Sequence, residues 1–401
     1  MRLNKAYTKV ILLMHRFSHW FLLTIFLLVT TLLWGQSADN WVTISETDRF
    51  QESHPIISAN HQTLYFSRYR HPRNLGAGNQ ADVWIRNRQA DGSWGRSLNA
   101  GSPINTNAAD RVLGISADGR RLAILREGAT TYLDILVKGD RSWRISGSWS
   151  LPPLGFATFD LEAQKLVFSQ YTTTTNGDLY TQTALANGEW SAAQPLQLIN
   201  TSATEDSPYL APDGQTIYFR RNDIWHLSRF DPTTSAFKDA ISLASYLPSN
   251  WEALTVSITQ PDRIVGTITP GEGRGVLQEG QLPLPARPIA SRLLEGKIKV
   301  LQSPTDRING ASIRLLVDGQ ERQLYPDKMG YYTLVVPAEG YARIVADAPG
   351  YFAPSRALNA TEELDRTLAD SKQNTYSSAY YEREQKIQEI HRNMAATRAE
   401  M

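Results

Sequence analysis

A four-part pattern recurs along most of the chain, and it constrains the fold more than any other feature. Each copy opens with two short segments of alternating apolar and small residues that flank a tight turn. In two copies the turn contains Asp-Gly, at Asp118 and Asp213, which is a strong signal for a β-hairpin. The five copies lie at residues 53–67, 111–125, 156–169, 207–219 and 253–268. The sequence therefore predicts five antiparallel hairpins.

The second half of each of the first four copies adds an aspartate before a short apolar segment, and then an aromatic residue. The aspartates are Asp82, Asp134, Asp178 and Asp223, and the aromatic residues are Trp94, Trp143, Trp190 and Phe237. Four strands that recur every 40 to 50 residues, approximately, are typical of a β-propeller blade, which buries its faces against neighbouring blades around an axis. We therefore predict an all-β, five-bladed propeller over residues 39–282.

The last copy is short of one strand. Its pattern ends near Gln281, whereas residues 41–44, before the first copy, form an apolar segment with no partner of their own. Because a ring of blades must close, we predict that the N-terminal strand completes the fifth blade.

The repeated aspartates have two interpretations. Carboxylates near a propeller axis can serve as the paired acid and base of a glycosidase. However, an acid that recurs once in each blade is more typical of a residue that accepts hydrogen bonds from backbone N–H groups in a turn. We favour the structural interpretation and expect no catalytic residues.

Three acids, Glu52, Asp110 and Glu205, enter a hairpin, and an arginine leaves each hairpin at the same spacing. Because the midpoints fall on the turns, antiparallel pairing should place each acid opposite its arginine. One interpretation is that these pairs brace the blades. The other is a docking rim for a partner or an anionic ligand, for which the candidates are Arg68, Arg70, Arg126, Arg220 and Arg221, with Arg73 nearby.

Both ends of the chain carry distinctive segments. Basic residues up to Arg16, an apolar run at residues 21–34 and a small, polar stretch at 35–38 are typical of a signal peptide over residues 1–38. An uncleaved anchor is the alternative, but the run is shorter than the roughly 20 residues that a spanning helix needs. We therefore expect an exported, periplasmic protein, which could associate with the outer membrane.

A second domain follows a proline-rich stretch at residues 283–292, which we expect to be an extended linker without helix or strand. Alternating segments then predict a small antiparallel β-sandwich over residues 293–360. The tail, residues 361–401, has apolar residues at helical spacing and predicts a C-terminal helix, which either packs on its own protein, frays or binds a partner.

Two parts of the chain resemble known families. Residues 206–219 and 222–225, with the matching first copy, resemble the WD-like (PD40-type) repeats of TolB-type propellers. Residues 296–300, 310–315, 330–337 and 348–351 are similar to the carboxypeptidase regulatory-like (prealbumin-type) domain. The combination resembles OmpA-family envelope proteins of gliding-motility and type IX secretion systems, but without their OmpA-like domain. The resemblance implies a scaffold for envelope proteins and gives no support for direct peptidoglycan binding.

Composition excludes several other functions. The chain has no cysteine, which excludes thiol catalysis and a lipid-modified cysteine. Its formal net charge is +1, so we expect no nucleic-acid partner. Motifs of zinc proteases, phosphate-binding loops and serine hydrolases are absent, and the histidines are dispersed, so we expect no metal and no cofactor. We expect a non-enzymatic envelope adaptor. The alternative is a carbohydrate-binding or carbohydrate-active propeller, with carboxylates that converge in a sugar-sized cleft.

Overall fold

The computed structural model describes residues 41–46, 49–76, 80–171, 177–185, 189–231, 233–269, 274–300, 311–317, 320–327, 330–338, 341–347, 355–359 and 374–376. The predicted signal peptide and C-terminal helix lie outside these residues. Within the described part of the chain, no helix is long and apolar enough to cross a membrane.

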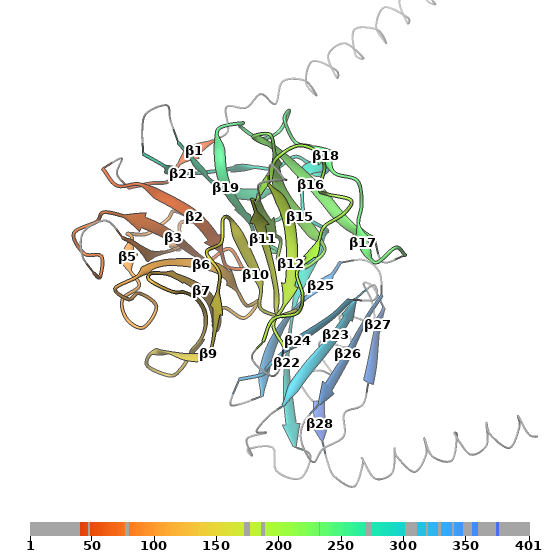
Figure 1. The fold of residues 1–401 in the computed structure, drawn as a ribbon. Helices are drawn as coiled ribbons and strands as arrows, with labels where there is room; N and C mark the ends of the chain where they lie inside the picture. The colour runs from red at the N-terminus through yellow and green to blue at the C-terminus, as the bar shows by residue number, and fades with distance from the viewer. Residues whose placement is uncertain are drawn as a thin grey trace, which may run out of the picture. The chain divides into compact units, whose positions relative to one another are not determined.

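Five antiparallel sheets form the first part of the structure, and each corresponds to one copy of the repeat (Figure 1). Blade 1 contains β2 (Glu52–Ile57), β3 (Thr63–Tyr69), β4 (Ala81–Asn87) and β5 (Leu98–Asn99). Blade 2 contains β6 (Ala109–Ile115), β7 (Arg121–Glu127), β8 (Thr131–Lys138) and β9 (Trp143–Leu151). Blade 3 contains β10 (Ala157–Asp160), β11 (Lys165–Gln170), β12 (Asp178–Thr183) and β13 (Gln194–Pro195).

Blade 4 has five strands: β14 (Glu205–Leu210), β15 (Thr216–Arg221), β16 (Ile224–Asp231), β17 (Ala236–Phe237) and β18 (Ile241–Ser242). Blade 5 contains β19 (Trp251–Val256), β20 (Arg263–Ile268), β21 (Val276–Gln281) and the N-terminal strand β1 (Val42–Thr43).

The five blades close into a ring, which confirms the predicted propeller. Their innermost strands contact one another in the order β2, β6, β10, β14, β19 and back to β2. The N-terminal strand β1 pairs with β21, with Val42 opposite Glu279. The first and last segments of the repeat region thus share one sheet, and this pairing confirms the predicted closure by the N-terminal strand.

Apolar residues that alternate along the strands form the core between neighbouring blades. Leu113 and Leu133 of blade 2 pack with Phe159 and Phe168 of blade 3, and similar clusters join blades 3 and 4 and blades 5 and 1. The contact between β6 and β10 is close at Gly114, where a Cβ atom would lie 2.0 Å from the backbone oxygen of Phe159. A side chain at that position would separate the two blades.

The hairpin turns follow the predicted chemistry. Gly119 and Gly214 have φ angles of 67° and 70°, in the left-handed region that glycine adopts without strain. In blade 1 the matching position is His61, with a φ of 60°. Asp213 fixes its turn further, since its carboxylate accepts hydrogen bonds from the backbone N–H groups of Gln215 and Thr216.

The proline-rich linker differs from the prediction because it contains a short 3₁₀ helix, η1 (Leu284–Ala286). Proline is compatible with the first turn of a helix because its φ is already fixed near the helical value. The linker also packs on blade 4, where the Tyr218 hydroxyl donates to the carbonyl of Ala286 at 2.7 Å. It is therefore attached to the propeller.

Two sheets follow the linker and enclose a second core. One contains β22 (Ser291–Val300), β25 (Tyr331–Pro337) and β28 (Asn374–Tyr376), in the order β25-β22-β28. The other contains β23 (Ser312–Val317), β24 (Gln320–Leu324), β26 (Tyr341–Asp347) and β27 (Ser355–Asn359), in the order β24-β23-β26-β27. Leu294, Ile313, Leu334 and Val336 lie in the core between them. The strand β28 pairs in parallel with β22, so this sheet includes residues that we had assigned to the tail.

Candidate functional site

The axis of the propeller is the natural place to look for a site, because the innermost strands of all five blades converge there. We call the end at which these strands begin the entry end, and the end at which their hairpin turns lie the turn end. Each end contains a cavity of only about 40 Å³. Because pockets for small molecules usually measure roughly 300–1,000 Å³, neither of these two cavities, as the described residues line them, has room for a sugar.

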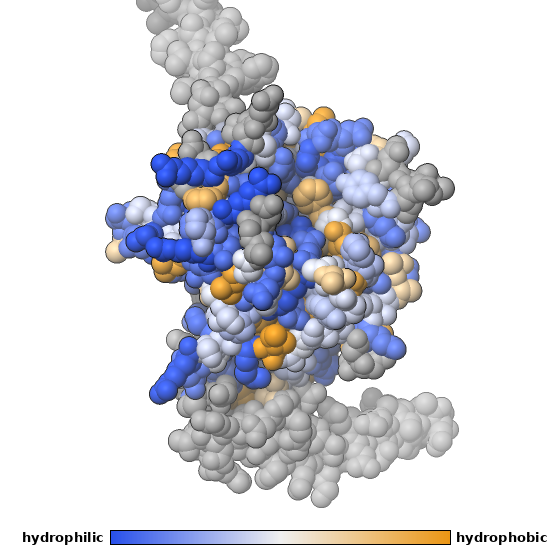
Figure 2. Space-filling view, turned by 60° about the vertical axis from the view of Figure 1, so that its left-hand side comes forward, coloured by the Kyte–Doolittle hydropathy of each residue, from blue (hydrophilic) through white to orange (hydrophobic). Residues whose placement is uncertain are grey.

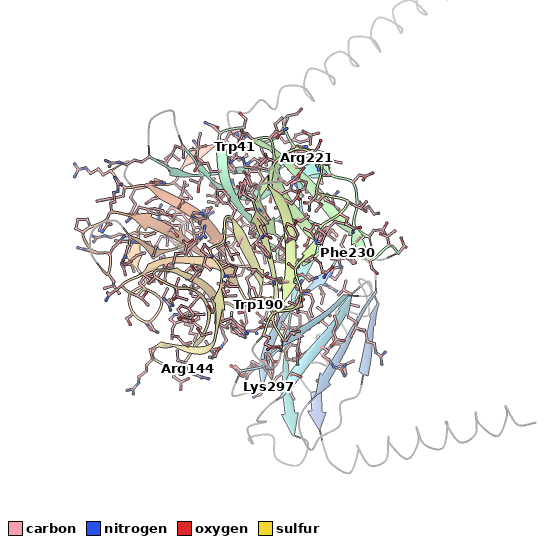
Figure 3. The ribbon with its side chains drawn as sticks, viewed as in Figure 1. Trp41, Arg144, Trp190, Arg221, Phe230 and Lys297 are labelled. Atoms are coloured by element: carbon pink, nitrogen blue, oxygen red, sulfur yellow. The ribbon has the colours of Figure 1, made fainter. Side chains whose placement is uncertain are left out.

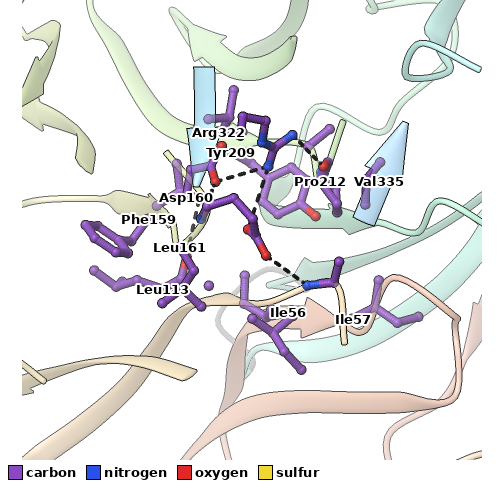
Figure 4. Close-up of a pocket in the computed structure, with 17 residues that line it drawn as sticks. Ile56, Ile57, Leu113, Phe159, Asp160, Leu161, Tyr209, Pro212, Arg322 and Val335 are labelled. Carbon is purple, nitrogen blue, oxygen red and sulfur yellow. Dashed lines mark hydrogen bonds and ion pairs between the residues drawn. The ribbon is translucent and has the colours of Figure 1, made fainter. Parts of the chain in front are cut away.

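Arg322 closes the turn end (Figure 4). This side chain comes from β24 of the sandwich and is buried. Its Nη2 lies 3.1 Å from Oδ1 of Asp160 and 3.7 Å from Oε2 of Glu162, and its Nη1 donates to the carbonyl oxygen of Pro212 at 3.1 Å. Gly214 permits this approach, since a Cβ atom there would lie 2.4 Å from Nη1 of Arg322.

The charges of this cluster are balanced. Glu162 also lies 3.8 Å from Arg121 and accepts a hydrogen bond from the N–H of Ala117, so two carboxylates face two guanidinium groups. Burial and the neighbouring Asp160 raise the pKa of Glu162. Burial alone would also raise the pKa of Asp160, but Arg322 and two backbone N–H groups hold it below its usual value. The two acids are therefore engaged in an internal network.

Further contacts of the sandwich fall on the same turns. The N–H of Gln323 donates to the carbonyl oxygen of Glu162 at 2.7 Å, and Val335 packs with Ala59 and Ile258. These contacts join the sandwich to blades 1, 3 and 5. A partner that approaches the turn end would have to displace them.

His54 and Arg111 mark the entry end. Nη1 of Arg111 lies 3.0 Å from Nε2 of His54, whose Nδ1 lies 2.7 Å from Oγ of Ser53. An arginine can only donate, so Nε2 accepts and Nδ1 carries the proton. Burial and the charge of Arg111 hold the pKa of His54 well below its usual value, which keeps the ring neutral. Nη2 of Arg111 also contacts Glu127 at 3.3 Å.

A second polar group lies at the same end, on β14 and the segment after β11. The Tyr171 hydroxyl donates to Oδ2 of Asp206 at 3.3 Å, and Arg220 lies opposite Asp206 in the sheet and pairs with Asp223. Burial and the Asp206 carboxylate raise the pKa of Tyr171 to about 12. Burial also raises the pKa of Asp206.

Several buried atoms at the entry end have no hydrogen-bond partner among the described residues. They are Oγ of Ser207, Oδ1 of Asp206 and Nε of Arg111. Buried polar atoms are usually satisfied, so this end retains hydrogen-bonding capacity that the blades do not use.

The predicted acid–arginine pairs form, and two arginines of the predicted docking rim, Arg68 and Arg126, are buried. Glu52 lies opposite Arg68, Asp110 opposite Arg126 and Glu205 opposite Arg221. Arg68 and Arg126 are buried, and Arg126 and Arg221 also donate to backbone carbonyls of the segments that lead into their blades. Arg220 is partly buried and pairs with Asp223, whereas Arg70 and Arg73 are exposed. The geometry thus favours the bracing interpretation, because buried guanidinium groups cannot dock a partner.

The repeated aspartates are not equivalent, contrary to the prediction. Asp82 lies opposite Arg68 and Asp178 opposite Gln170, but Asp134 lies two positions deeper, opposite Ile124. Asp223 lies in the turn before β16 with an exposed side chain. Asp82 accepts from the N–H of Leu75, as the structural interpretation requires, whereas Asp134 accepts from Arg126 and Ser148.

The sequence analysis missed the residues that line the entry end. His54–Pro55 and Ser207–Pro208 occupy the same position in copies 1 and 4, and each causes a bulge in its innermost strand, with φ angles of 50° and 48°. This repeated residue-proline pair was the available signal. In the described part of the chain, no group of three or more acids or histidines could hold a metal ion.

Comparison with known proteins finds similar propeller structures but does not assign the chain to a family. No protein-family model and no curated protein matches the sequence. TolB from Acinetobacter baumannii is 13% identical with a TM-score of 0.34, over 58% of this chain and 56% of TolB. A GH130-family structure, described for glycoside hydrolases that target β-1,2 mannosidic linkages in Candida mannan, is 9% identical with a TM-score of 0.37, over 63% and 96%. A periplasmic gluconolactonase from Pseudomonas aeruginosa is 12% identical with a TM-score of 0.28, over 78% and 96%. At these values the similarities carry no argument about activity.

Proposed function

We propose that this chain is an exported, non-enzymatic scaffold of the cell envelope that holds a protein partner across the entry end of its propeller. One observation carries the proposal. The turn end is closed by the charge-balanced cluster around Arg322, whereas the entry end retains unsatisfied polar atoms of Ser207, Asp206 and Arg111.

The small volume of the cavity at the entry end favours a macromolecular partner over a small ligand. A cavity of about 40 Å³ at the entry end holds little more than a water molecule, so recognition must extend over the surrounding loops. Arg70, Glu127 and Tyr171 are available there, with both charges represented. On the face shown in Figure 2, hydrophilic residues predominate and hydrophobic residues are scattered, which suits a polar, reversible interface.

The alternative function, a carbohydrate-active propeller, would need carboxylates that converge in a cleft. Asp160 and Glu162 do converge near the axis, but Arg322 and Arg121 neutralise them, and the cavity at that end of the axis measures only about 40 Å³. The proposal therefore assigns these acids to the attachment of the sandwich.

Crosslinking in intact cells followed by affinity capture tests the proposal. Replacing Arg70, Glu127 and Tyr171 with alanine should abolish capture of the crosslinked partner without loss of folding, because these side chains are partly or fully exposed. The matched control replaces Lys238 and Glu321, which are exposed elsewhere, and should leave capture intact. Unchanged capture in the first variant would refute the entry end as the site.

The non-enzymatic part of the proposal has its own test. Purified protein is incubated with a panel of aryl glycosides and lactones, and product release is compared with that of an Asp206→Asn variant. We expect no turnover above buffer in either protein. Turnover that disappears in the variant would overturn this part of the proposal.

A further inference from the structure

Two hollows lined by described residues lie away from both ends of the axis. One, of about 610 Å³, is lined by the outer strands of blade 2, by Gln164 and Leu185 of blade 3 and by residues 323–327 of the sandwich. A second, of about 460 Å³, continues from it along β22 and β25. Asp118, Arg120 and Asp327 line both hollows, and Arg120 lies 3.5 Å from Asp327, so the two hollows are adjacent; together we call them the groove. Each volume falls within the range of ligand sites, which often lie where two domains meet.

Three aromatic rings lie along this groove. Trp149 lies against Gly147, where a Cβ atom would approach the ring to 2.7 Å, so the glycine makes room for the indole. Tyr325 and Tyr331 are 50% and 54% exposed, although tyrosine usually buries most of its ring. Lys297 lies 4.5 Å from the centre of the Tyr331 ring. Trp149 also packs against the core between blades 2 and 3, and Arg121 lies 5.7 Å from the centre of the Tyr325 ring. The exposed aromatic surface of the groove therefore comes mainly from Tyr325 and Tyr331.

The positive and negative charges of the side chains in the groove balance one another. Its cations are Arg120, Arg121, Lys138, Arg144 and Lys297, and its acids are Asp118, Asp140, Glu295 and Asp327. Arg121 also lies 3.8 Å from Glu162, which offsets the extra positive charge. Arg144 extends outward from the propeller, and Lys297 lies on the sandwich (Figure 3). Gln164 and Gln323 add amide groups.

We propose that this groove binds an extended, neutral oligosaccharide. Sugar rings present C–H faces that pack on aromatic rings, whose π-faces are negative, and hydroxyl groups that bond to carboxylates, amides and cations alike. A polyanion such as nucleic acid would require a net positive groove, which the charge balance does not provide. The volumes of the two adjacent hollows, about 610 and 460 Å³, leave room for more than one sugar unit. This inference goes beyond the proposed function, since it concerns different residues and a different ligand.

Isothermal titration calorimetry with four probes tests the inference: cellotetraose, laminaritetraose, mannotetraose and chitotetraose. We expect at least one to bind with a Kd of about 1 mM or tighter, as is usual for a few stacked rings. Tyr325→Ala and Tyr331→Ala should each weaken this binding about tenfold, and Tyr325→Phe should retain it. Tyr132→Ala, at an exposed tyrosine outside the groove, is the matched control and should change nothing.

Two outcomes would overturn the inference: binding of none of the four probes, even if an added acidic probe, tetragalacturonate, does bind, or binding that the Tyr325 and Tyr331 variants leave unchanged. None of these results depends on partner capture at the entry end. A failure of the oligosaccharide site is therefore distinguishable from a failure of the proposed function.

Discussion

Replacing Arg322 with methionine is the sharpest test of the attachment between the two domains. Methionine preserves much of the side-chain volume but leaves Glu162 with Arg121 alone and Asp160 without a guanidinium partner. Removing one partner of a buried ion network typically costs about 3–5 kcal/mol. With a urea slope of about 2 kcal/mol/M, the unfolding midpoint should fall by about 1.5–2.5 M.

The effect should depend on pH in a defined direction. Arg322 lowers the pKa of Asp160, so its contribution is fully present above the pKa of the unfolded carboxyl group, near 4, and is lost as the pH falls further. The deficit of the variant should therefore be largest at neutral pH and shrink in acid. A double variant that also carries Asp160→Asn removes the uncompensated carboxylate, keeps Glu162 paired with Arg121 and should recover much of the loss at pH 7.

Urea unfolding followed by the fluorescence of the 10 tryptophans, together with hydrogen exchange at β24, gives the measurement. A chain of this size need not unfold in one step, so midpoints of separate transitions are compared. An Arg322→Met midpoint within about 0.5 M of wild type, or a double variant no more stable than the single one, would refute the assigned role of the network.

Three further predictions concern the ring and its entry end. Gly114→Ala places a Cβ atom 2.0 Å from a backbone oxygen of β10 and should lower the free energy of unfolding by about 1–3 kcal/mol or more in thermal melts. The control is Gly128→Ala, where the nearest atom to the new Cβ lies at 3.6 Å, and it should leave stability nearly unchanged. Truncation through Ser45 removes β1 and exposes the edge of β21. We therefore expect a lower melting temperature, and self-association that size-exclusion chromatography detects. A monomer with an unchanged melting temperature would contradict the role of β1 in closing the ring. Because the pKa of His54 is lowered beside Arg111, the free energy of unfolding should fall as the pH drops below about 6.5, by at most about 1.4 kcal/mol per pH unit. In urea titrations, His54→Gln should reduce this dependence on pH. An equal dependence in both proteins would contradict a neutral His54.

The fold could be predicted because its physical causes are local and repeated. The alternation of apolar and polar residues in each copy determines which face of a strand is buried. Turn residues such as Asp118 and Gly119 determine where the chain reverses direction. The acid–arginine pairs were also predictable, since antiparallel register is symmetric about a turn. The short helix in the linker was not, because proline permits both an extended chain and a first helical turn.

The candidate site could be predicted only in part, because burial is a property of the assembled ring. The spacing that places Arg68 opposite Glu52 does not reveal that both side chains are buried in the assembled ring. Arg322 shows the same limit more strongly. It lies in a different domain from its partners Asp160 and Glu162, at a position with no repeated pattern, so no periodicity in the sequence connects them.

The two proposed binding sites use separate parts of the molecule, and this separation has a measurable consequence. The entry end is lined by residues such as His54 and Ser207 at the beginning of the innermost strands, whereas the groove is lined by outer strands and the sandwich. No described residue lines both. A protein bound at one site therefore leaves the other accessible, and a scaffold that holds both ligands raises the effective concentration of its partner near the glycan. Partner capture should accordingly be unchanged by a saturating tetrasaccharide that binds the groove. If that sugar instead displaced the partner, the two ligands would have to share one surface, and the assignment of the partner to the entry end would be wrong.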